Sequence, residues 1–134
     1  MPCKEIDKMF SDVEMLINAA RKVLGEFSLV GESCAGSVGA AIKSSSGKIY
    51  TGICIDVQCG IGFCAEHAAI SEMLKSRETV IDFVVAVGKS GIISPCGRCR
   101  ELMMQIDKKN AETKVILDTN RVVFLKELLP EHHF

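Results

Sequence analysis

Three cysteines have the residue type and spacing of a metal site. Cys96 and Cys99 are three positions apart, so both thiols can lie on one face of a first helical turn and reach a single ion. Cys64 can supply a third sulfur if the fold brings its segment to the same place. A zinc ion with three protein ligands keeps a fourth position open, which is typical of catalysis rather than structure. The sequence therefore predicts one Zn²⁺ per chain, held by Cys64, Cys96 and Cys99.

A glutamate beside this cluster could move protons. In an open zinc site the metal lowers the pKa of a water from about 16 to about 7, so hydroxide is available at neutral pH. Glu66 follows Cys64 by two positions and points in a different radial direction in a regular helix, which leaves its carboxylate free of the metal. Hydrolysis by such a water needs a group that takes a proton from the water and delivers a proton to the leaving group. We predict that Glu66 is this catalytic group.

Other interpretations of these residues stay open. A Cys-x-x-Cys pair also occurs in dithiol redox proteins, and a fourth ligand from Cys59 would close the zinc site into a structural one. Glu66 taken alone could be a solvated side chain near a helix N-terminus. The remaining cysteines, Cys3, Cys34, Cys54 and Cys59, are predicted to be buried packing residues, because free cysteine commonly packs in protein interiors.

Two side chains are candidates to support the metal through its ligands. Three thiolates and Zn²⁺ sum to a charge of minus one, which helix N-termini and hydrogen bonds to sulfur can offset. Arg98 lies between two of the cysteines and His67 follows Glu66, so both are predicted to donate such hydrogen bonds. His67 is equally compatible with a core histidine whose ring nitrogen has another partner.

The elements that position these residues follow from periodicity and turn chemistry. Apolar residues at helical spacing predict an amphipathic helix over 4–24. Strands 38–42 and 49–57 flank a polar, glycine-ended turn at 44–47, which favours a hairpin. The other predicted elements are helix 64–75, strand 80–87, a helix from Ser94-Pro95 to about Lys109, strands 114–117 and 121–125, and a tail over 126–134.

The order of these elements indicates a sheet with helices on its faces. If strands 49–57 and 80–87 are parallel neighbours, the helix that begins at Cys64 is their crossover. Both cysteine-bearing helices then begin at the carboxyl edge of the sheet, where such folds bind ligands. This topology would bring Cys64 to the Cys96 and Cys99 pair.

Length and charge narrow the class of protein. The 134 residues are 48% hydrophobic, which suits a single domain over 1–134. The 16 basic and 17 acidic side chains nearly cancel and no basic stripe is present, so nucleic acid is not an expected partner. Residues 1–21 mix charges with apolar residues, unlike a signal peptide or a membrane span. We expect a cytoplasmic protein with no membrane partner.

The motifs resemble those of the small cytidine deaminases that hold zinc with three cysteines. The handful of matching segments lies between residue 33 and the end: Cys64-Ala65-Glu66, Ser94-Pro95-Cys96-Gly97-Arg98-Cys99-Arg100, and residues 38–41, 50–52 and 126–130. Residues 92–100 and the Leu-Leu-Pro tail are especially similar to the blasticidin S deaminases, relatives that act on a cytosine-containing antibiotic. Zinc deaminases with this signature use a glutamate as the general acid and base.

The resemblance implies a three-layer α/β/α sandwich with a mixed central sheet, and a homotetramer whose neighbouring chains complete each pocket. It also implies a small nucleoside-type substrate, with Asp56, Ala65 and Phe134 as substrate-binding residues. The family's Asn-x-Glu pair on the strand before the zinc helix is absent, and the aromatic residue expected two positions before Val38 is replaced by Gly36. Asp56 is the candidate replacement for the missing pair.

The function expected from these observations is hydrolytic, zinc-dependent deamination of a cytosine-type nucleoside or analogue, such as cytidine, deoxycytidine or a blasticidin S-like compound, to the uracil form with release of ammonia. Two alternatives remain. The protein could deaminate another amino-heterocycle, such as a free or modified pyrimidine base. It could also be a zinc-stabilised protein that binds nucleosides without turnover.

Overall fold

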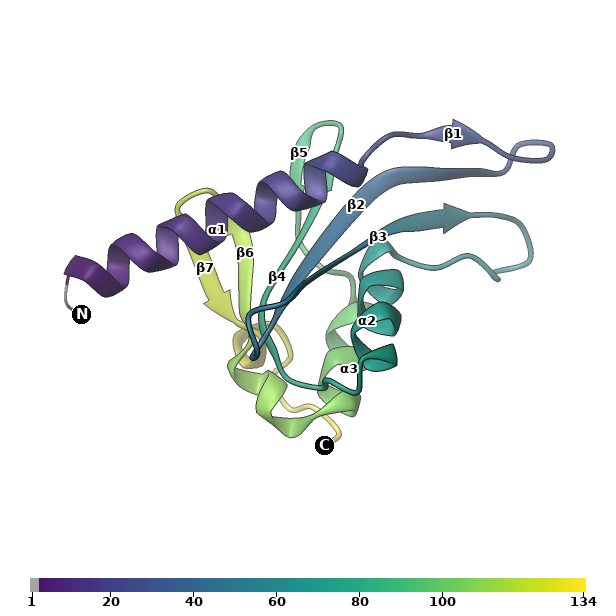
Figure 1. The fold of residues 1–134 in the computed structure, drawn as a ribbon. Helices are drawn as coiled ribbons and strands as arrows, with labels where there is room; N and C mark the ends of the chain where they lie inside the picture. Colours follow the sequence, from purple (N-terminus) through teal and green to yellow (C-terminus); the bar gives the residue numbers. More distant parts are fainter. Residues whose placement is uncertain (1–2) are drawn as a thin grey trace.

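A mixed β-sheet forms the middle of the molecule (Figure 1). In the computed structural model, which describes residues 3–134, its strands are β1 (Phe27–Ser28), β2 (Cys34–Ser44), β3 (Ile49–Asp56), β4 (Ile81–Gly88), β5 (Gly91–Ile93), β6 (Lys114–Asp118) and β7 (Arg121–Phe124). The helices are α1 (Cys3–Val23), α2 (Ala65–Lys75) and α3 (Gly97–Ile106), with 3-10 turns at Lys108–Glu112 and Leu125–Leu128. β4 and β6 run parallel, while the other paired strands are antiparallel.

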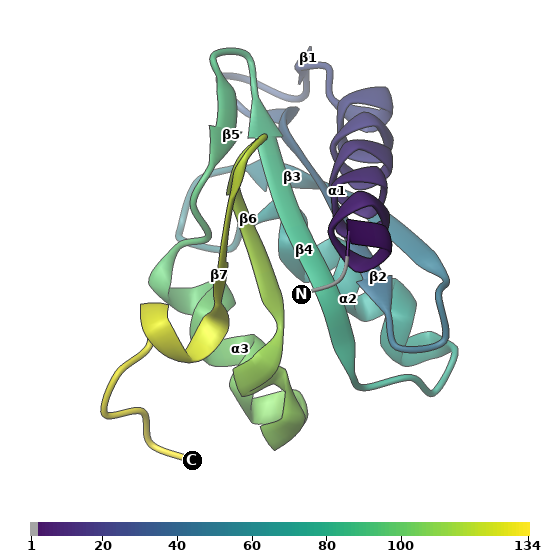
Figure 2. The same cartoon turned by 90° about the vertical axis from the view of Figure 1, so that its left-hand side faces the viewer.

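Helices cover both faces of the sheet, which confirms the predicted three-layer α/β/α sandwich. Figures 1 and 2 show α1 on one face and α2 and α3 on the other. Side chains alternate along β4, as they must in a strand: Phe83 and Val85 pack against α1, whereas Val84 packs in the core under α2 and α3. The buried apolar stripe of α1, which includes Leu16 and Ile17, is the one its 3.6-residue period predicted.

The prediction that strands 49–57 and 80–87 are neighbours is wrong, because β2 lies between them. β2 pairs antiparallel with β3 and, along its other edge, with β4. β3 and β4 therefore run in the same direction without touching, and their carboxyl ends lie at one end of the sheet. α2 follows β3, and α3 follows the β4–β5 hairpin. The two helices can therefore still begin close together, as the predicted cysteine site requires.

The boundaries of α3 differ from the prediction at both ends. The helix begins at Gly97 with Cys96 as N-cap, because the side chain of Arg100 binds the groups at Ser94 and Pro95 that were expected to start it. It ends at Ile106 rather than Lys109. Asp107 has extended backbone, and its carboxylate accepts a hydrogen bond from the N–H of Lys109, which starts a separate 3-10 turn.

Two short strands were not predicted, and one strand is longer than expected. β1 and β5 have too few residues for a periodic pattern to be recognised. β2 begins at Cys34, four residues before the predicted start at residue 38. Its register with β3 shifts between Ala35 and Gly39. This bulged part of β2 lies near the end of β3, where the functional residues described below gather.

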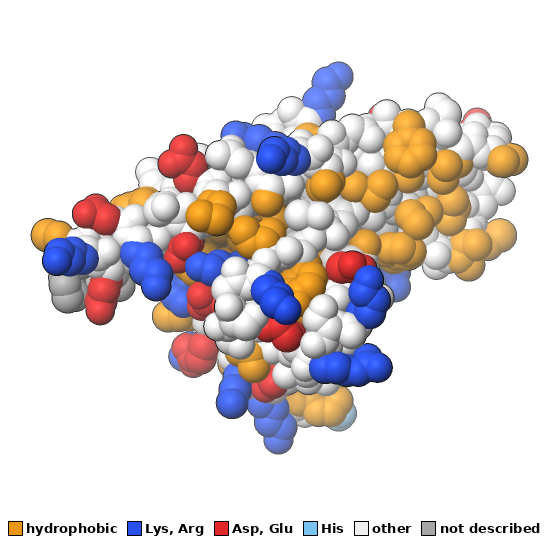
Figure 3. Space-filling model, in the orientation of Figure 1, with side chains coloured by type: hydrophobic (Ala, Val, Ile, Leu, Met, Phe, Trp, Pro, Cys, Tyr) orange, Lys and Arg blue, Asp and Glu red, His pale blue; other side chains and the backbone are white. Residues whose placement is uncertain are grey.

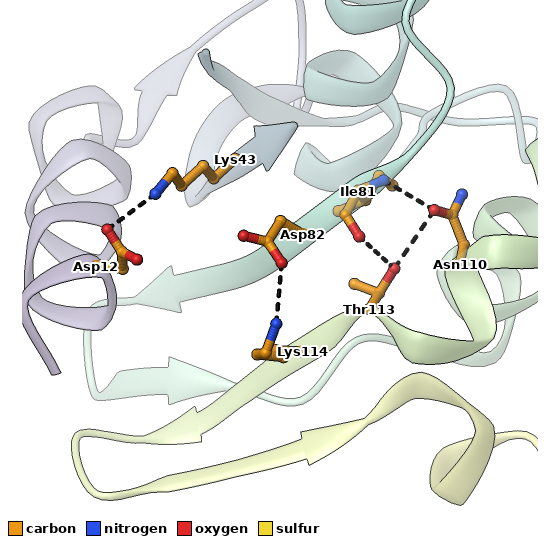
Figure 4. A network of polar contacts seen from close by, with 7 residues as sticks. All are labelled: Asp12, Lys43, Ile81, Asp82, Asn110, Thr113 and Lys114. Carbon is orange, nitrogen blue, oxygen red and sulfur yellow. Dashed lines mark hydrogen bonds and ion pairs between the residues drawn. The ribbon is translucent and has the colours of Figure 1, made fainter. Parts of the chain in front are cut away.

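Buried hydrogen bonds fix the end of α3 against the sheet (Figure 4). The side chain of Asn110 accepts a hydrogen bond from the N–H of Ile81 at 2.8 Å and donates to the carbonyl of Met103 at 2.8 Å. Thr113 donates to the carbonyl of Ile81 at 2.8 Å. Both polar side chains are fully buried, so each unmade bond would leave a desolvated group. The network joins the end of α3 to the first residue of β4.

Gly52 allows α2 to lie directly on β3. A Cβ atom at this position would come within 2.6 Å of the carbonyl oxygen of Ala65 and of the Cβ of Ala68. Any larger residue would push the first turn of α2 away from the sheet. Gly52 therefore sets the distance between the first turn of α2 and the sheet. The candidate functional residues project from this turn.

Candidate metal centre and catalytic cavity

The first turns of α2 and α3 meet, and they bring the three cysteines together. Cys64 is the N-cap residue of α2 and Cys96 is the N-cap residue of α3, both with extended backbone. Their Sγ atoms lie 3.3 Å apart, and the Sγ of Cys99 lies 3.5 Å from that of Cys96. The residues that the sequence selected from two distant segments thus form one cluster.

The cluster fits a zinc ion. Thiolates that bind zinc tetrahedrally at about 2.3 Å lie about 3.8 Å from one another. The three sulfur atoms lie within 4.8 Å of one another, so Cys64, Cys96 and Cys99 could hold one metal ion. Cys59 does not belong to this group and is exposed, so the described residues do not support a closed site with Cys59 as fourth ligand.

Burial and the helix terminus act on the thiols in opposite directions. Burial, followed by the charge of Glu66, raises the pKa of the Cys99 thiol. Burial also raises the pKa of Cys64. At Cys96 burial acts in the same direction, but the backbone N–H of Cys99 and the neighbouring thiols outweigh it, and the pKa is lowered. A metal that binds here must therefore displace a proton from the buried Cys99.

A cavity of about 600 Å³ opens beside the cluster and is lined by Cys64, Cys96 and Glu66. Glu66 is only 4% exposed, and no hydrogen bond joins its carboxylate to another residue of the described chain. Buried carboxylates normally have partners, so an acceptor left unpaired in a cavity wall is suited to a ligand. The structure places the predicted proton carrier next to the thiol cluster, in a space large enough for a nucleoside.

The other predicted site residues divide into two groups. Ala65, Asp56 and Arg98 line the same cavity. Phe134 does not line it: the ring is 50% exposed and packs edge-on against His133, with centroids 4.8 Å apart. A contribution of Phe134 to its own chain's cavity is therefore not supported.

His67 also lies outside the cavity lining, and its environment keeps it neutral. Its Nε2 atom is buried and has no hydrogen-bond partner among the described residues. Burial lowers the pKa of the imidazole, and the nearby charge of Arg98 lowers it further, so the ring is uncharged at pH 7. Within residues 3–134 neither the imidazole of His67 nor the guanidinium of Arg98 forms a hydrogen bond to a cysteine sulfur, whereas the backbone N–H of Arg98 helps to lower the pKa of Cys96.

The four remaining cysteines do not share one role. Cys54 is buried, as predicted, and it also lines the cavity. Cys34 is only partly buried. Cys3 and Cys59 are exposed, so the prediction that they are packing residues is wrong; Cys3 lies at the first residue of α1 and Cys59 in the β3–α2 loop.

Sequence analysis missed Ser37, which lines the cavity and contacts two other lining residues. Its hydroxyl donates to Oδ2 of Asp56 at 3.1 Å and lies 3.1 Å from Sγ of Cys54. The backbone N–H of Val38 donates to the same sulfur at 3.3 Å. Gly36, with a φ of 83° at the bulge in β2, was the available signal, because bulges often redirect side chains next to active sites.

Arg100 was quoted within the motif but given no role, and it positions the segment before Cys96. Its guanidinium donates to the carbonyl of Pro95 at 2.7 Å, to Oγ of Ser94 at 3.1 Å and to the carbonyl of Leu128 at 3.0 Å. This fork of hydrogen bonds ties the C-terminal tail to the segment that presents Cys96. Arg100 therefore supports the geometry of the cluster without entering it.

Comparison with curated proteins finds relatives over about two thirds of the chain. A blasticidin-S deaminase of Bacillus cereus is 30% identical over 102 residues, which are 69% of this chain and 70% of that protein. A cytidine deaminase of Halalkalibacterium halodurans is 30% identical over 99 residues, which are 69% of this chain and 74% of that protein.

Solved structures of cytidine deaminases share the fold. The enzyme from Mycobacterium tuberculosis superposes with a TM-score of 0.76 at 26% identity, over 92% of this chain and 98% of that one. The enzyme from Burkholderia pseudomallei gives 0.72 at 26% identity, over 89% and 97%. The family described as "Cytidine and deoxycytidylate deaminase zinc-binding region" matches residues 12–114. The chain therefore belongs to the cytidine and deoxycytidylate deaminase family, zinc-dependent hydrolases that act on the C–N bond of a cytosine amine.

Proposed function

We propose that this protein hydrolyses the exocyclic amine of a cytosine-type nucleoside or nucleoside analogue, which releases ammonia and gives the uracil form. The observation that carries the proposal is the buried, unpaired carboxylate of Glu66 in the same cavity as the thiols of Cys64 and Cys96. In the reaction a C–O bond forms from water, the C–N bond to the amine breaks, and the protons of water are redistributed.

Glu66 would carry every proton that moves in this reaction. Zinc bound by the three thiolates supplies a Lewis acid that makes water nucleophilic at neutral pH. The Glu66 carboxylate would accept a proton from the attacking water and give it to the ring nitrogen beside the attacked carbon. It would then take the second proton of that water, from the hydroxyl group now on the carbon, and give it to the departing amine, which leaves as ammonia. Burial excludes competing water from this carboxylate, and its position beside Cys64 keeps it close to the attacked carbon.

The test is an ammonia-release screen of the zinc-loaded protein against cytidine, deoxycytidine, cytosine, 5-substituted cytidines, blasticidin S and adenosine. We expect stoichiometric ammonia and uracil-type product from at least one cytosine nucleoside or analogue. Turnover of free bases alone would support the other amino-heterocycle interpretation. Binding measured by calorimetry without any turnover would support a nucleoside-binding protein, and would contradict the proposal.

We also propose that Asp56 and Ala65 contact the substrate. Ala65 is fully buried at the start of α2 and lines the cavity, so its backbone can face a base ring. Asp56 lies at the end of β3, where its carboxylate can accept hydrogen bonds from hydroxyl groups of a sugar. We propose that Phe134 acts in the cavity of a neighbouring subunit.

Arg98 is proposed to offset the negative charge of a loaded three-thiolate site. It is exposed at the second position of α3, lines the cavity and lies close enough to His67 to lower that ring's pKa. We propose that the buried Nε2 atom of His67 carries the ring's proton and donates a hydrogen bond to a thiolate. This atom has no other hydrogen-bond partner in the described chain.

We expect Arg98→Met to lower kcat about tenfold while about one zinc per chain is retained, because a hydrogen bond or charge near the ligands tunes the metal rather than holding it. Arg98→Lys should recover part of the loss. Steady-state ammonia release and metal analysis check both variants. Unchanged kcat in Arg98→Met would remove Arg98 from the reaction.

The assembly and compartment are proposed from the resemblance and from the surface. Figure 3 shows hydrophobic side chains gathered over the end of the molecule that carries β1 and the tips of β2 and β3. Val30 is 91% exposed and Ile61 is 74% exposed in the loops there. Patches of this kind mark protein contacts. We propose that the chain acts as one deaminase domain over 1–134, assembled as a cytoplasmic homotetramer.

No helix in residues 3–134 combines the length and apolar character needed to cross a membrane. Sedimentation or light scattering of the purified protein measures the proposed assembly directly.

A further inference from the structure

A short irregular segment carries Cys96 to the metal centre. Residues 94–96 connect β5 to α3 and belong to neither element. Pro95 has no backbone N–H with which to hold this segment. Cys96 must nevertheless be placed accurately, because a thiolate that binds zinc has to lie at about 2.3 Å from the metal in a tetrahedral arrangement. Contacts from outside the segment must therefore fix its position.

The guanidinium of Arg100 makes such contacts from the first turn of α3. Its Nε donates to the carbonyl of Pro95 at 2.7 Å, and one Nη donates to Oγ of Ser94 at 3.1 Å. The other Nη donates to the carbonyl of Leu128 at 3.0 Å. Three nitrogens of one planar group thus bind three acceptors. A shift of any one acceptor therefore disturbs the hydrogen bonds to the other two.

The third acceptor belongs to a C-terminal turn that is fixed by contacts of its own. Leu128 is the last residue of this 3-10 turn, which Figure 2 shows in yellow beside α3. The side chain of Leu125 is fully buried, and its N–H donates to the carbonyl of Thr113 at 2.9 Å. The carboxylate of Glu127 accepts a hydrogen bond from the N–H of Phe124 at 2.7 Å. The turn therefore gives Arg100 a firm point of attachment.

Arg100 is the polar link between this turn and the metal centre. Arg100 and Leu128 are 28 positions apart in the sequence. Within residues 3–134, no other hydrogen bond joins residues 125–134 to the segment 94–100, which holds Cys96 and Cys99. Whatever moves or frees the turn therefore acts on the Cys96 segment through one guanidinium.

We propose that Arg100 is a positioning residue that couples the metal centre to the C-terminal turn. The docked turn holds Cys96 where zinc binds, so that binding orders less of the chain and loses less entropy. Bound zinc in turn favours the docked turn, because the coupling is reciprocal: docking raises zinc affinity by the same factor by which zinc raises the docking equilibrium constant. The inference rests on the zinc site and is independent of the proposed deamination.

Zinc affinity provides the first test. It is measured by competition between the metal-free protein and a chromogenic chelator, with Zn²⁺ as the added ligand. Loss of an outer partner of a metal site commonly weakens metal binding by about 10–100-fold, and we expect about tenfold for Arg100→Met. Arg100→Lys should recover only part of this loss, because an ammonium cannot bind three acceptors in one plane. Arg121→Met, at an exposed position of β7, is the matched control and should bind zinc like the parent protein.

Amide hydrogen exchange measures the reciprocal effect in the unaltered protein. The exchange rates of residues 125–129 report the opening of the C-terminal turn. Zinc should slow this exchange by about tenfold, the same factor as the affinity change, and should not slow it in Arg100→Met. If Arg100 served only the stability of the fold, its loss would lower the Tm of the metal-free and zinc-loaded proteins alike and leave the effect of zinc on exchange in place.

A change in the turn itself tests the coupling from the other side. Glu127→Ala removes the carboxylate that binds the N–H of Phe124 and leaves Arg100 intact. Loss of such a cap loosens the turn, and zinc affinity should fall by about threefold, although Glu127 is distant from every cysteine of the cluster in the sequence. Glu131→Ala, which removes an exposed carboxylate just after the turn, is the matched control and should leave zinc affinity unchanged.

Two results would overturn the inference: parent-like zinc affinity in Arg100→Met, or exchange of residues 125–129 that zinc does not slow in the parent protein. The exchange measurement needs no variant, so it decides the matter even if Arg100→Met does not fold. Absence of ammonia release from every compound of the screen would contradict the deaminase function and leave this coupling standing.

Discussion

Glu66→Gln is expected to keep its zinc and lose deamination by about three to four orders of magnitude in kcat. General acid and base catalysis by one group contributes about 10²–10⁴, and here a single carboxylate performs every transfer. Glutamine has nearly the same shape but cannot accept and return a proton. Ammonia release under saturating substrate, with metal analysis of the same sample, measures both quantities.

Stability provides the control for this variant. Glu66 is 4% exposed and has no hydrogen-bond partner in the described chain, and glutamine fills nearly the same space. The substitution therefore removes no contact within the described chain, and we expect the Tm of Glu66→Gln to stay close to that of the parent protein. Glu72→Gln, on the exposed side of the same helix, should change neither Tm nor kcat. A zinc-loaded Glu66→Gln protein with unchanged ammonia release would show that Glu66 does not carry the protons.

Cys96→Ala is expected to lose both the metal and the activity. Removal of one thiolate leaves two protein ligands from Cys64 and Cys99, too few for a stable site. Zinc content after dialysis should fall from about one per chain to nearly zero, and Tm should fall as well, because metal binding free energy adds to folding free energy. Plasma emission spectrometry and thermal unfolding, each with and without added zinc, measure these changes.

A matched cysteine and the pH dependence sharpen this experiment. Cys3→Ala removes an exposed thiol at the start of α1 and should retain zinc and activity. In the parent protein, burial raises the pKa of Cys99, so zinc must displace its proton and retention should weaken as the pH falls. A Cys96→Ala protein that stays fully loaded would exclude Cys96 from the ligands.

Local sequence patterns predicted those features that depend on interactions between residues close together in the sequence. The 3.6-residue period of apolar side chains placed α1 within one residue at each end, and β-branched runs placed β4 and β6. The spacing of Cys96 and Cys99 fixed their common helical face. The family resemblance, carried by two short motifs, supplied the fold class, which the sheet topology and the solved structures confirm.

Patterns failed where a neighbour in space decides the outcome. Ser94 and Pro95 have the residue types of a helix start, yet the guanidinium of Arg100 binds their polar groups and the helix begins two residues later. β2 lies between β3 and β4 because it pairs with both strands. The residues of β3 and of β4 do not reveal that both strands pair with β2. Ser37 could not be selected from its own surroundings, because its partners Cys54 and Asp56 lie on another strand.

By itself the sequence determined which residues can do the chemistry: three cysteines, a glutamate, and helix starts that carry them. Only the tertiary structure decided that Sγ of Cys64 lies 3.3 Å from Sγ of Cys96, that Glu66 is buried without a partner in residues 3–134, and that Asp56 lines the same cavity as Glu66. The physical reason is that residue type and spacing act over one helical turn, whereas burial, charge and sulfur-to-sulfur distance depend on segments that the sheet brings together.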